Sequence, residues 1–299
     1  MQTTILPRLA QSAGIYREHP AAGALAAHLK CLWLHQLPDG AALPIAVVPD
    51  GCADIIWTSR GLAVVGPDRV AAFPRLAPGE TIVGARFRIG AAAIFLRTPL
   101  SELTGQMLPL DLLWGRVAGE VDERLASARD ASERFTVLAS ALGGRLSTVR
   151  APSPNVVSLV KHLHERRPTA ADPIRALART TGLSERSLRR LCLEHFGYGA
   201  KTLDRILRLQ RFLAACRGRP RKNLAILALD AGYADQAHLS REARELTTLT
   251  PREIRLQLAA DPTRSEKTDP VKHEIGRFVQ DRCATDCYQS EKRRHAWPR

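Results

Sequence analysis

A short pattern occurs twice in this chain of 299 residues, and the second copy lies about fifty residues after the first. In the first copy Leu177-Ala178 is followed by Gly182, and in the second Leu227-Ala228 is followed by Gly232. The spacing from alanine to glycine is four residues in both copies. Such a repeat constrains the fold strongly, because each copy must build the same local structure.

The repeat predicts two helix-turn-helix units. The small alanine lets a second helix cross closely over the first, and the glycine ends the first helix where φ > 0 is favoured. Ser184 and Asp235 are good N-caps for the helices that follow, and apolar residues three or four apart, such as Leu188 and Leu191, give each of these helices a buried face. The alternative is a pair of α-hairpins packed as a scaffold. The basic second helices of both copies favour DNA binding instead.

The distribution of charge supports this interpretation. The chain carries 44 Lys and Arg against 30 Asp and Glu, a formal net charge of +14. Residues 151–260 hold 20 Lys and Arg against 10 Asp and Glu, whereas residues 1–150 hold 15 against 13. The excess therefore lies on the repeat, where the phosphates of DNA would be met.

The N-terminal half predicts a small antiparallel sheet or partial barrel with a helical pair. Residues 1–23 are expected to be loop-like, because Pro and Gly punctuate them. Short apolar runs separated by turn residues predict strands at 29–37, 45–48, 53–58, 62–65 and 81–89. Helical spacing of apolar residues follows at 91–97, 117–128 and 131–148, with a further turn at 99–105.

The C-terminal half predicts helices only, so the fold class is α+β. A lead helix at 155–167 precedes the first unit at 173–196, a long helix at 201–216 and the second unit at 223–246. Pro251 begins a closing helix. Prolines near residue 152 indicate a linker, which divides the chain into a regulatory domain at 1–150 and a DNA-binding domain at 151–260. Residues 261–299 are expected to be a disordered tail.

Residues 155–258 resemble the DNA-binding domain of AraC-family transcription regulators. The resemblance rests on residues of both turns and of the helices after them, and on a final Thr-Pro: Leu177-Ala178, Gly182-Leu183-Ser184, Leu188, Arg190, Gly232-Tyr233, Asp235-Gln236, His238-Leu239-Ser240-Arg241 and Thr250-Pro251. Three positions depart from the family's usual residues. Cys192 and Ala243 replace phenylalanine, and Thr248 replaces a glycine.

The resemblance implies that the second helix of each unit enters the major groove, on successive turns of the duplex. On this sequence the candidate DNA-binding residues are Arg186, Arg189, Arg190, Gln236, Ser240 and Arg241. Arginine pairs bidentately with guanine, and Gln236 suits adenine. Arg190 and Arg241 occupy equivalent places in the two copies. For every arginine the alternatives are a phosphate contact or a solvated helix face, and we expect His238 to contact phosphate or to pack.

The N-terminal half resembles an uncharacterised sensor-like domain found on one branch of such regulators, through Pro49-Asp50-Gly51 and residues 84–88. In many family members this half is a cupin-like barrel that binds a small molecule. Such a pocket could be lined by Asp50, Asp54, Arg86 and Arg88, with Trp33 and Trp57 as its apolar wall. The alternative, which we favour, is that Asp50 and Gly51 form a turn and both tryptophans lie in the core.

We expect no metal and no cofactor, because the strands lack clustered His and Glu. Cys283 and Cys287 lie near His273 and His295, but in a segment without a packable core. No catalytic grouping is visible, so we expect a regulator and not an enzyme. The alternative is a small β-domain enzyme, or a partner-binding protein, with an appended DNA-binding module.

The expected partner is double-stranded DNA; RNA polymerase, a small-molecule effector and a second copy of the chain are further candidates. Residues 1–10 lack the pattern of a signal peptide, and no run of eighteen apolar residues occurs. We therefore expect a cytoplasmic protein without a membrane segment.

Overall fold

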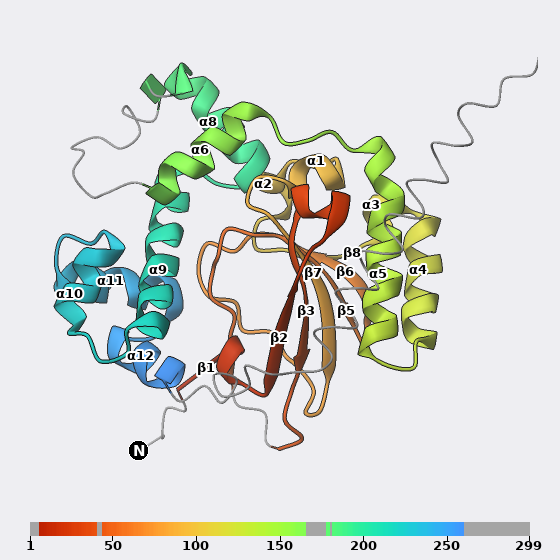
Figure 1. The fold of residues 1–299 in the computed structure, drawn as a ribbon, viewed down its shortest axis with the longest axis horizontal. Coiled ribbons are helices and arrows are strands. Elements are labelled where there is room, and N and C mark those ends of the chain that lie inside the picture. The colour runs from red at the N-terminus through yellow and green to blue at the C-terminus, as the bar shows by residue number, and fades with distance from the viewer. Residues whose placement is uncertain (1–5, 41–43, 166–177, 180, 260–299) are drawn as a thin grey trace, which may run out of the picture.

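A computed structural model of the chain describes residues 6–40, 44–165, 178–179 and 181–259. An antiparallel six-stranded sheet organises the N-terminal half, with strand order β2-β3-β7-β5-β6-β8 (Figure 1). Its strands are β2 (Ile15–Pro20), β3 (Leu29–Gln36), β5 (Asp54–Thr58), β6 (Gly61–Val65), β7 (Thr81–Phe87) and β8 (Met107–Pro109). The sheet is open, because β2 and β8 remain at its two edges and do not pair with each other. The α+β class is confirmed.

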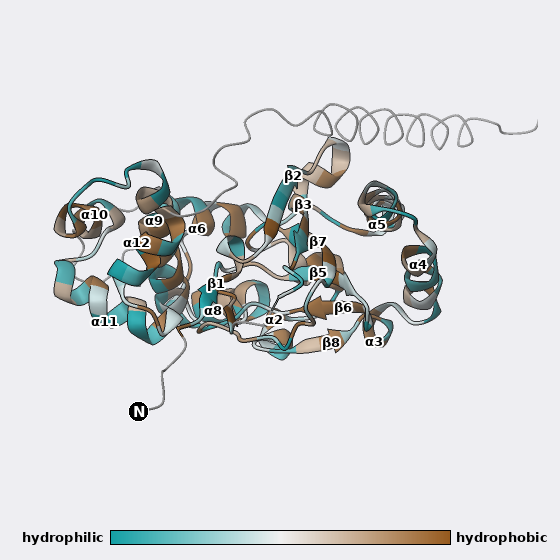
Figure 2. Cartoon of the chain, turned by 90° about the horizontal axis from the view of Figure 1, so that it is seen from below, coloured by the Kyte–Doolittle hydropathy of each residue, from teal (hydrophilic) through white to brown (hydrophobic). Residues whose placement is uncertain are grey.

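Helices cover one face of the sheet and bury its apolar side chains. These helices are α1 (Ala92–Leu96), α2 (Leu100–Leu103), α3 (Asp111–Trp114), α4 (Arg116–Ser127) and α5 (Ala131–Arg145). The resulting core joins strand residues such as Ile55 and Val83 to helix residues such as Phe95 and Leu138, each less than 1% exposed. Figure 2 shows α4 and α5 beyond the strands at one side of the molecule. The predicted helical pair is therefore packed against the sheet.

A second, two-stranded sheet lies beside the first. Strand β1 (Arg8–Leu9) pairs in parallel with β4 (Ile45–Ala46). Val47, next to β4, forms an isolated bridge with Ala72 in the long loop between β6 and β7. Short 3₁₀ turns at Ala10–Ser12, Gly23–Ala27 and Leu146–Thr148 complete this half.

The C-terminal half is helical. Its described helices are α6 (Pro154–Glu165), α8 (Glu185–Phe196), α9 (Ala200–Gly218), α10 (Leu224–Ala231), α11 (Gln236–Thr247) and α12 (Pro251–Ala259). Two apolar cores form around α9. One lies under α6 and α8, and the other lies under α10, α11 and α12. Each core thus stabilises one of the predicted units, and the long helix α9 contributes to both.

The two halves share apolar contacts. Leu9 of β1 is 3% exposed and belongs to the core of α9, α10, α11 and α12. Ile89, directly before Gly90, packs against the core of α6 and α8. A Cβ atom added at Gly90 would lie 2.4 Å from Val156, so the glycine allows α6 to approach the sheet closely. The helical half therefore rests directly on the N-terminal half.

One expectation from the sequence was wrong, because residues 1–23 contain β1 and β2 where loop was expected. No element was predicted where β8 and α3 lie. The predicted first helix of the first unit lies mostly outside the described residues, and so does the expected tail at 261–299. Of the helices that the structure describes, none has the length and hydropathy needed to cross a bilayer.

Candidate DNA-binding surface

The turn of the second unit is a complete Schellman motif. Gly232 ends α10 with φ of 97°, and its N–H donates to the Leu229 carbonyl at 3.0 Å. The Tyr233 N–H donates to the Ala228 carbonyl at 2.9 Å. These two bonds satisfy carbonyls that the helix end leaves open, and Tyr233 then fills the corner with its ring fully buried.

The turn of the first unit repeats these bonds. Gly182 has φ of 67°, and its N–H donates to the Arg179 carbonyl at 3.3 Å. The Leu183 N–H donates to the Ala178 carbonyl at 3.1 Å. The predicted roles of the two glycines are confirmed, because both adopt the left-handed backbone conformation that a side chain disfavours.

Both predicted N-caps are also confirmed. The Ser184 hydroxyl accepts from the Ser187 N–H at 3.1 Å, and the Asp235 carboxylate accepts from the His238 N–H at 2.6 Å. The N-cap lies two residues after the glycine in the first unit and three residues after the glycine in the second. Arg190 and Arg241 nevertheless stand at the same place, since each is the sixth residue after its cap.

The candidate residues of α8 project away from the core. Arg186, Arg189 and Arg190 are exposed, and they lie opposite the buried Leu188 and Cys192. All three arginines stand in the first half of the helix. This side of α8 therefore presents three guanidinium groups to the surroundings.

The candidates of α11 differ in exposure. Gln236 and Arg241 are exposed, whereas Ser240 is partly buried and donates its hydroxyl to the Gln236 carbonyl at 2.8 Å. Arg244, which the sequence analysis did not select, is also exposed and lies one helical turn beyond Arg241. The spacing of three residues could have indicated it. His238 packs edge-on against the Tyr233 ring, with 5.3 Å between the ring centroids.

An ion-pair network fixes α11 on α9. The Arg205 guanidinium donates to Glu242 at 3.1 Å and also bonds Glu245. Arg208 donates to Asp204 at 2.7 Å and stacks over the Tyr233 ring at 5.3 Å. Because Glu242 is 8% exposed, its pairing with Arg205 offsets the cost of burying a charge. The network therefore fixes the orientation of α11 relative to α9.

A capping box starts α12, the closing helix that was predicted to begin at Pro251. The Glu253 N–H donates to the Thr250 hydroxyl at 3.2 Å, and the Glu253 carboxylate accepts from the Thr250 N–H at 2.7 Å. Pro251 is the first residue of the helix, where a missing N–H costs nothing.

The C-terminal ends of α8 and α11 touch the N-terminal half. After α8, the Thr104 hydroxyl donates to the Gly197 carbonyl at 3.0 Å. At the end of α11, the Ala71 N–H donates to the Leu246 carbonyl at 2.7 Å. Both helices are therefore held at one end, while the exposed arginines lie nearer the other end of α8 and in the middle of α11.

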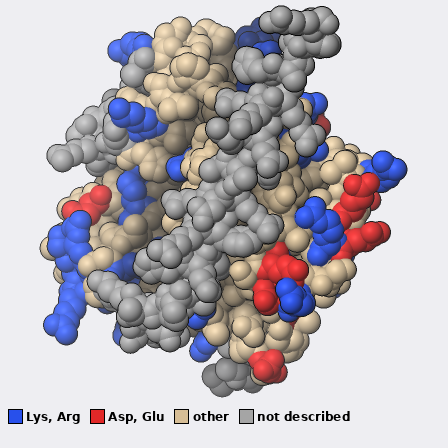
Figure 3. Space-filling model, turned by 45° about the vertical axis from the view of Figure 1, so that its right-hand side comes forward, with Lys and Arg blue, Asp and Glu red and all other residues tan. Residues whose placement is uncertain are grey.

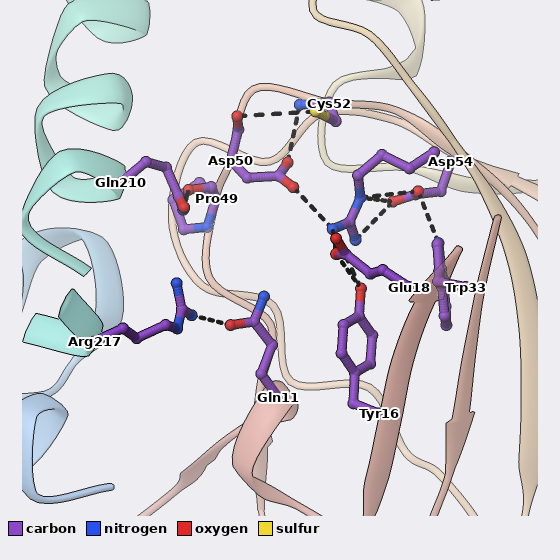
Figure 4. A network of polar contacts seen from close by, with 11 residues as sticks. Gln11, Tyr16, Glu18, Trp33, Pro49, Asp50, Cys52, Asp54, Gln210 and Arg217 are labelled. Carbon is purple, nitrogen blue, oxygen red and sulfur yellow. Dashed lines mark hydrogen bonds and ion pairs between the residues drawn. The ribbon is translucent and has the colours of Figure 1, made fainter. Parts of the chain in front are cut away.

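A charged cluster lies between the sheet and α9 (Figure 4). We call it the Arg86 cluster; its members are Tyr16, Glu18, Trp33, Asp50, Asp54 and Arg86. The Arg86 guanidinium pairs with Asp54 at 3.1 Å, with Asp50 at 3.4 Å and with Glu18 at 3.4 Å. The Trp33 indole N–H donates to Asp54 at 3.1 Å. Burial raises the pKa of Asp54, and the Arg86 guanidinium opposes this shift.

This arrangement decides between the two interpretations of the N-terminal residues. Asp50 and Gly51 form a turn, since the Cys52 N–H donates to the Asp50 carboxylate at 2.9 Å and Gly51 has φ of 83°. Trp33 and Trp57 are both buried. Trp57 belongs to the core under the helices, on the other face from Trp33, and Arg88 is exposed and bonds the Ala26 carbonyl. The six residues therefore do not line one common pocket.

Gly84 explains part of the sequence pattern around Arg86. It pairs with Trp33 across β7 and β3, and a Cβ atom placed there would lie 2.3 Å from the Trp33 ring. Only glycine leaves room for the indole to lie flat on the strand. Nearby, burial and the charges of Asp50 and Asp54 raise the pKa of Asp68 to about 6.

Acidic and basic side chains are mixed on the face shown in Figure 3. On α4 and α5, Arg116 pairs with Glu120 at 3.3 Å and Arg129 with Glu133 at 3.1 Å. The described residues contain no group of three or more His, Cys, Asp or Glu that could hold a metal ion. The cysteines and histidines of the tail lie outside the described residues.

Two family models match the chain. Residues 177–257 match a model described as a helix-turn-helix domain, and residues 17–109 match one described as a domain of unknown function, DUF6597. No curated protein matches. The second match covers most of the six-stranded sheet, and the first covers both units and most of α12.

Solved structures resemble the chain more distantly. An AraC-type transcriptional regulator from Chromobacterium violaceum is 25% identical, over 36% of this chain and 93% of that chain, with a TM-score of 0.33. A variant of apo ToxT from Vibrio cholerae is 11% identical, over 82% and 97%, with a TM-score of 0.40. ToxT with bound unsaturated fatty acid is 11% identical, over 81% and 95%, with a TM-score of 0.39.

These TM-scores lie below 0.5, so the assignment depends on the family models and on the two turns. The C-terminal half is an AraC-type helix-turn-helix domain, and the N-terminal half is a DUF6597 domain. With this domain, the chain is a DNA-binding transcription regulator.

Proposed function

We propose that the chain binds a specific DNA sequence by placing α8 and α11 in two successive stretches of the major groove. The observation that carries this proposal is the equivalence of the two helices. Each follows the same hydrogen-bonded turn and N-cap, and each exposes an arginine at the sixth residue after that cap. Recognition helices contact base edges mainly through the residues near their N-termini.

Each candidate residue has a role in this proposal. Arg190 and Arg241 read guanine bidentately, and Gln236 reads adenine. Arg186 and Arg189 contact phosphates or a second base, and Arg244 contacts phosphate. The Ser240 hydroxyl is engaged with the Gln236 carbonyl, so we assign it a contact with the backbone of DNA at most.

The length of α9 suits this arrangement. Its nineteen residues span about 28 Å at 1.5 Å per residue. One turn of the duplex measures about 34 Å. A rigid helix of this length, with one unit packed near each end, can present both recognition helices to the same side of the duplex.

The proposal assigns regulation to residues 1–150 and DNA binding to residues 151–260. The N-terminal half contacts the C-terminal ends of α8 and α11, and it also contacts α9, where the Gln210 amide donates to the Pro49 carbonyl at 2.7 Å. A change in the N-terminal half would therefore alter the relative placement of the two helices. Promotion or repression of transcription would follow from that placement.

The test selects binding sites from a random pool for the full chain, for Arg190→Ala and for Arg241→Ala. If both residues read bases, each variant loses preference at one or two positions, about ten base pairs apart, with a loss of roughly 1–3 kcal/mol. Arg116→Ala is the matched control, because Arg116 lies on α4 and its side chain is 93% exposed.

If each variant instead binds all DNA sequences more weakly to the same extent, both residues contact phosphates. In that case the slope of log affinity against log salt concentration should fall by about one for each variant. Overlapping positions of lost preference would contradict the two-groove arrangement. A wild-type chain that selects no sequence over random DNA would overturn the proposal.

A further inference from the structure

A pocket opens beside the two-stranded sheet. Its volume is about 350 Å³, within the range of roughly 300–1,000 Å³ that is usual for small-molecule sites. One wall contains Arg8, Pro44 and Ile45 at β1 and β4, and the other is formed by residues 73–78 of the loop before β7. Its lining includes no member of the Arg86 cluster.

The charges in this pocket are of one sign. Among the described residues that line it, Arg8 and Arg75 are the only ionisable ones, and both are exposed. Within the described part of the chain, neither guanidinium forms an ion pair or a hydrogen bond. Two unpaired guanidinium groups at one pocket favour an anionic group, since Arg binds carboxylate through charge-assisted hydrogen bonds.

The remaining lining is apolar. Leu37, Leu76 and Ile45 lie within it, with prolines around them, and Phe73 stands at it with 46% of its surface exposed. A large aromatic side chain that is half exposed beside a pocket gains free energy when an apolar molecule covers it. The lining as a whole therefore suits a small molecule with an apolar body and one anionic group.

The segments that form both walls are hydrogen-bonded to helices of the DNA-binding half. On the β1 side, the Leu9 N–H donates to the Gln257 side chain of α12 at 2.7 Å, and Gln257 donates to the Pro7 carbonyl at 2.9 Å. On the loop side, Ala71 holds the end of α11 through the Leu246 carbonyl. Any shift of the walls around a ligand would thus be passed to α11 and α12.

We infer that this pocket is an effector site for a small apolar molecule that carries a single carboxylate or comparable anion. The anion lies between Arg8 and Arg75, and the apolar body lies against Phe73 and Leu76. The inference rests on the proposed regulation, because it names the site and the ligand class through which the N-terminal half would act on the second unit.

The first experiment measures binding to the full chain, without DNA, by isothermal titration calorimetry. The probe is 4-phenylbutanoate, compared with 4-phenylbutanol and 4-phenylbutylamine, which share its apolar body. The carboxylate should bind at least about tenfold more tightly than either analogue, since only the carboxylate can form charge-assisted hydrogen bonds with the two guanidinium groups. Equal binding of the alcohol, or no binding of the carboxylate, would overturn the inference.

The second experiment locates the site. Arg8→Gln and Arg75→Gln should each weaken binding of the carboxylate by about tenfold and leave the weak binding of the alcohol unchanged. Arg116→Gln is the control, because it removes an exposed arginine elsewhere. Wild-type affinity in both pocket variants would show that the probe binds at another place.

The third experiment separates the site from the proposed function. DNA affinity of the wild-type chain is measured with and without the probe, and the same is done for Arg75→Gln. A change in the wild type that the variant loses supports the full inference. Binding of the probe without any effect on DNA affinity retains the site but removes its role as an effector site. A chain that binds the probe but selects no DNA sequence contradicts the proposed function alone.

Discussion

Thr248 ends α11 with φ of 64° and ψ of −5°, in the left-handed region. Arg97 is the only other residue besides glycine with positive φ among the described residues. A β-branched side chain in this conformation crowds the following carbonyl, which costs free energy. The position is nevertheless required, because the Thr248 N–H closes the helix on the Arg244 carbonyl at 2.9 Å.

We expect Thr248→Gly to stabilise the chain by about 1 kcal/mol, because relief of backbone strain exceeds the added flexibility of glycine in the unfolded state. The free energy of unfolding is measured by urea denaturation. Thr136→Gly, within α5, is the control and should destabilise by a similar amount. A loss of stability in Thr248→Gly would show that the left-handed turn carries no strain.

Single residues of the site were largely predictable. Glycine at a left-handed turn and Ser or Asp at an N-cap have local causes, so Gly182, Gly232, Ser184 and Asp235 could be assigned from the sequence. The partial burial of Ser240 could not be foreseen, because its hydroxyl bond to Gln236 competes with contacts outside the helix. Whether any of these side chains touches a base is still a prediction.

At the scale of elements, the sequence predicted those with strong apolar periodicity and missed those without it. Strand β2 is an edge strand with mostly exposed residues, and it exists because β3 offers it a hydrogen-bonding partner. Strands β1 and β8 span two and three residues and likewise depend on their neighbours. Pairing partners that lie far away in the chain leave no signal in a short polar segment.

The two turns allow a test at this scale. Gly182→Val and Gly232→Val should each cost roughly 1–3 kcal/mol, because valine strongly disfavours positive φ. Gly143→Val is the matched control: Gly143 lies in α5, a Cβ atom added there would meet nothing within 4 Å, and its φ is not positive. Thermal or urea denaturation measures the three variants. If the control loses as much stability as the turn variants, the cost belongs to valine itself and not to the turns.

At the scale of the whole molecule, the two halves are less separate than the sequence suggests. Proline-rich composition near residue 152 predicts a linker, yet Leu9 lies in the core of the second unit and Ile89 lies against that of the first. Contacts over such sequence separations have no local pattern. This is why the placement of the N-terminal half, and the pocket that it forms, could not be inferred from the sequence.

Leu9→Ala should therefore destabilise the DNA-binding half by about 2–4 kcal/mol, since it leaves a cavity among buried side chains of α9 and α12. Amide hydrogen exchange reports the effect locally, and protection should fall in α12. Leu6→Ala is the control, because Leu6 is 50% exposed. Unchanged protection of α12 in Leu9→Ala would mean that the contact contributes nothing to that core.

The position of Leu9 in the core of α9, α10, α11 and α12 also has a consequence for folding during synthesis. The ribosome synthesises residue 9 early and the residues of α12 late, so the core that joins them cannot form until residue 259 has been added. Contacts between residues so distant in sequence also form slowly, because the entropy cost of closing a long loop precedes the free energy gained from the contacts. Only a chain that has been translated to the end of α12 would then contain the complete core of the second unit. Any DNA binding that depends on this unit would begin after that point.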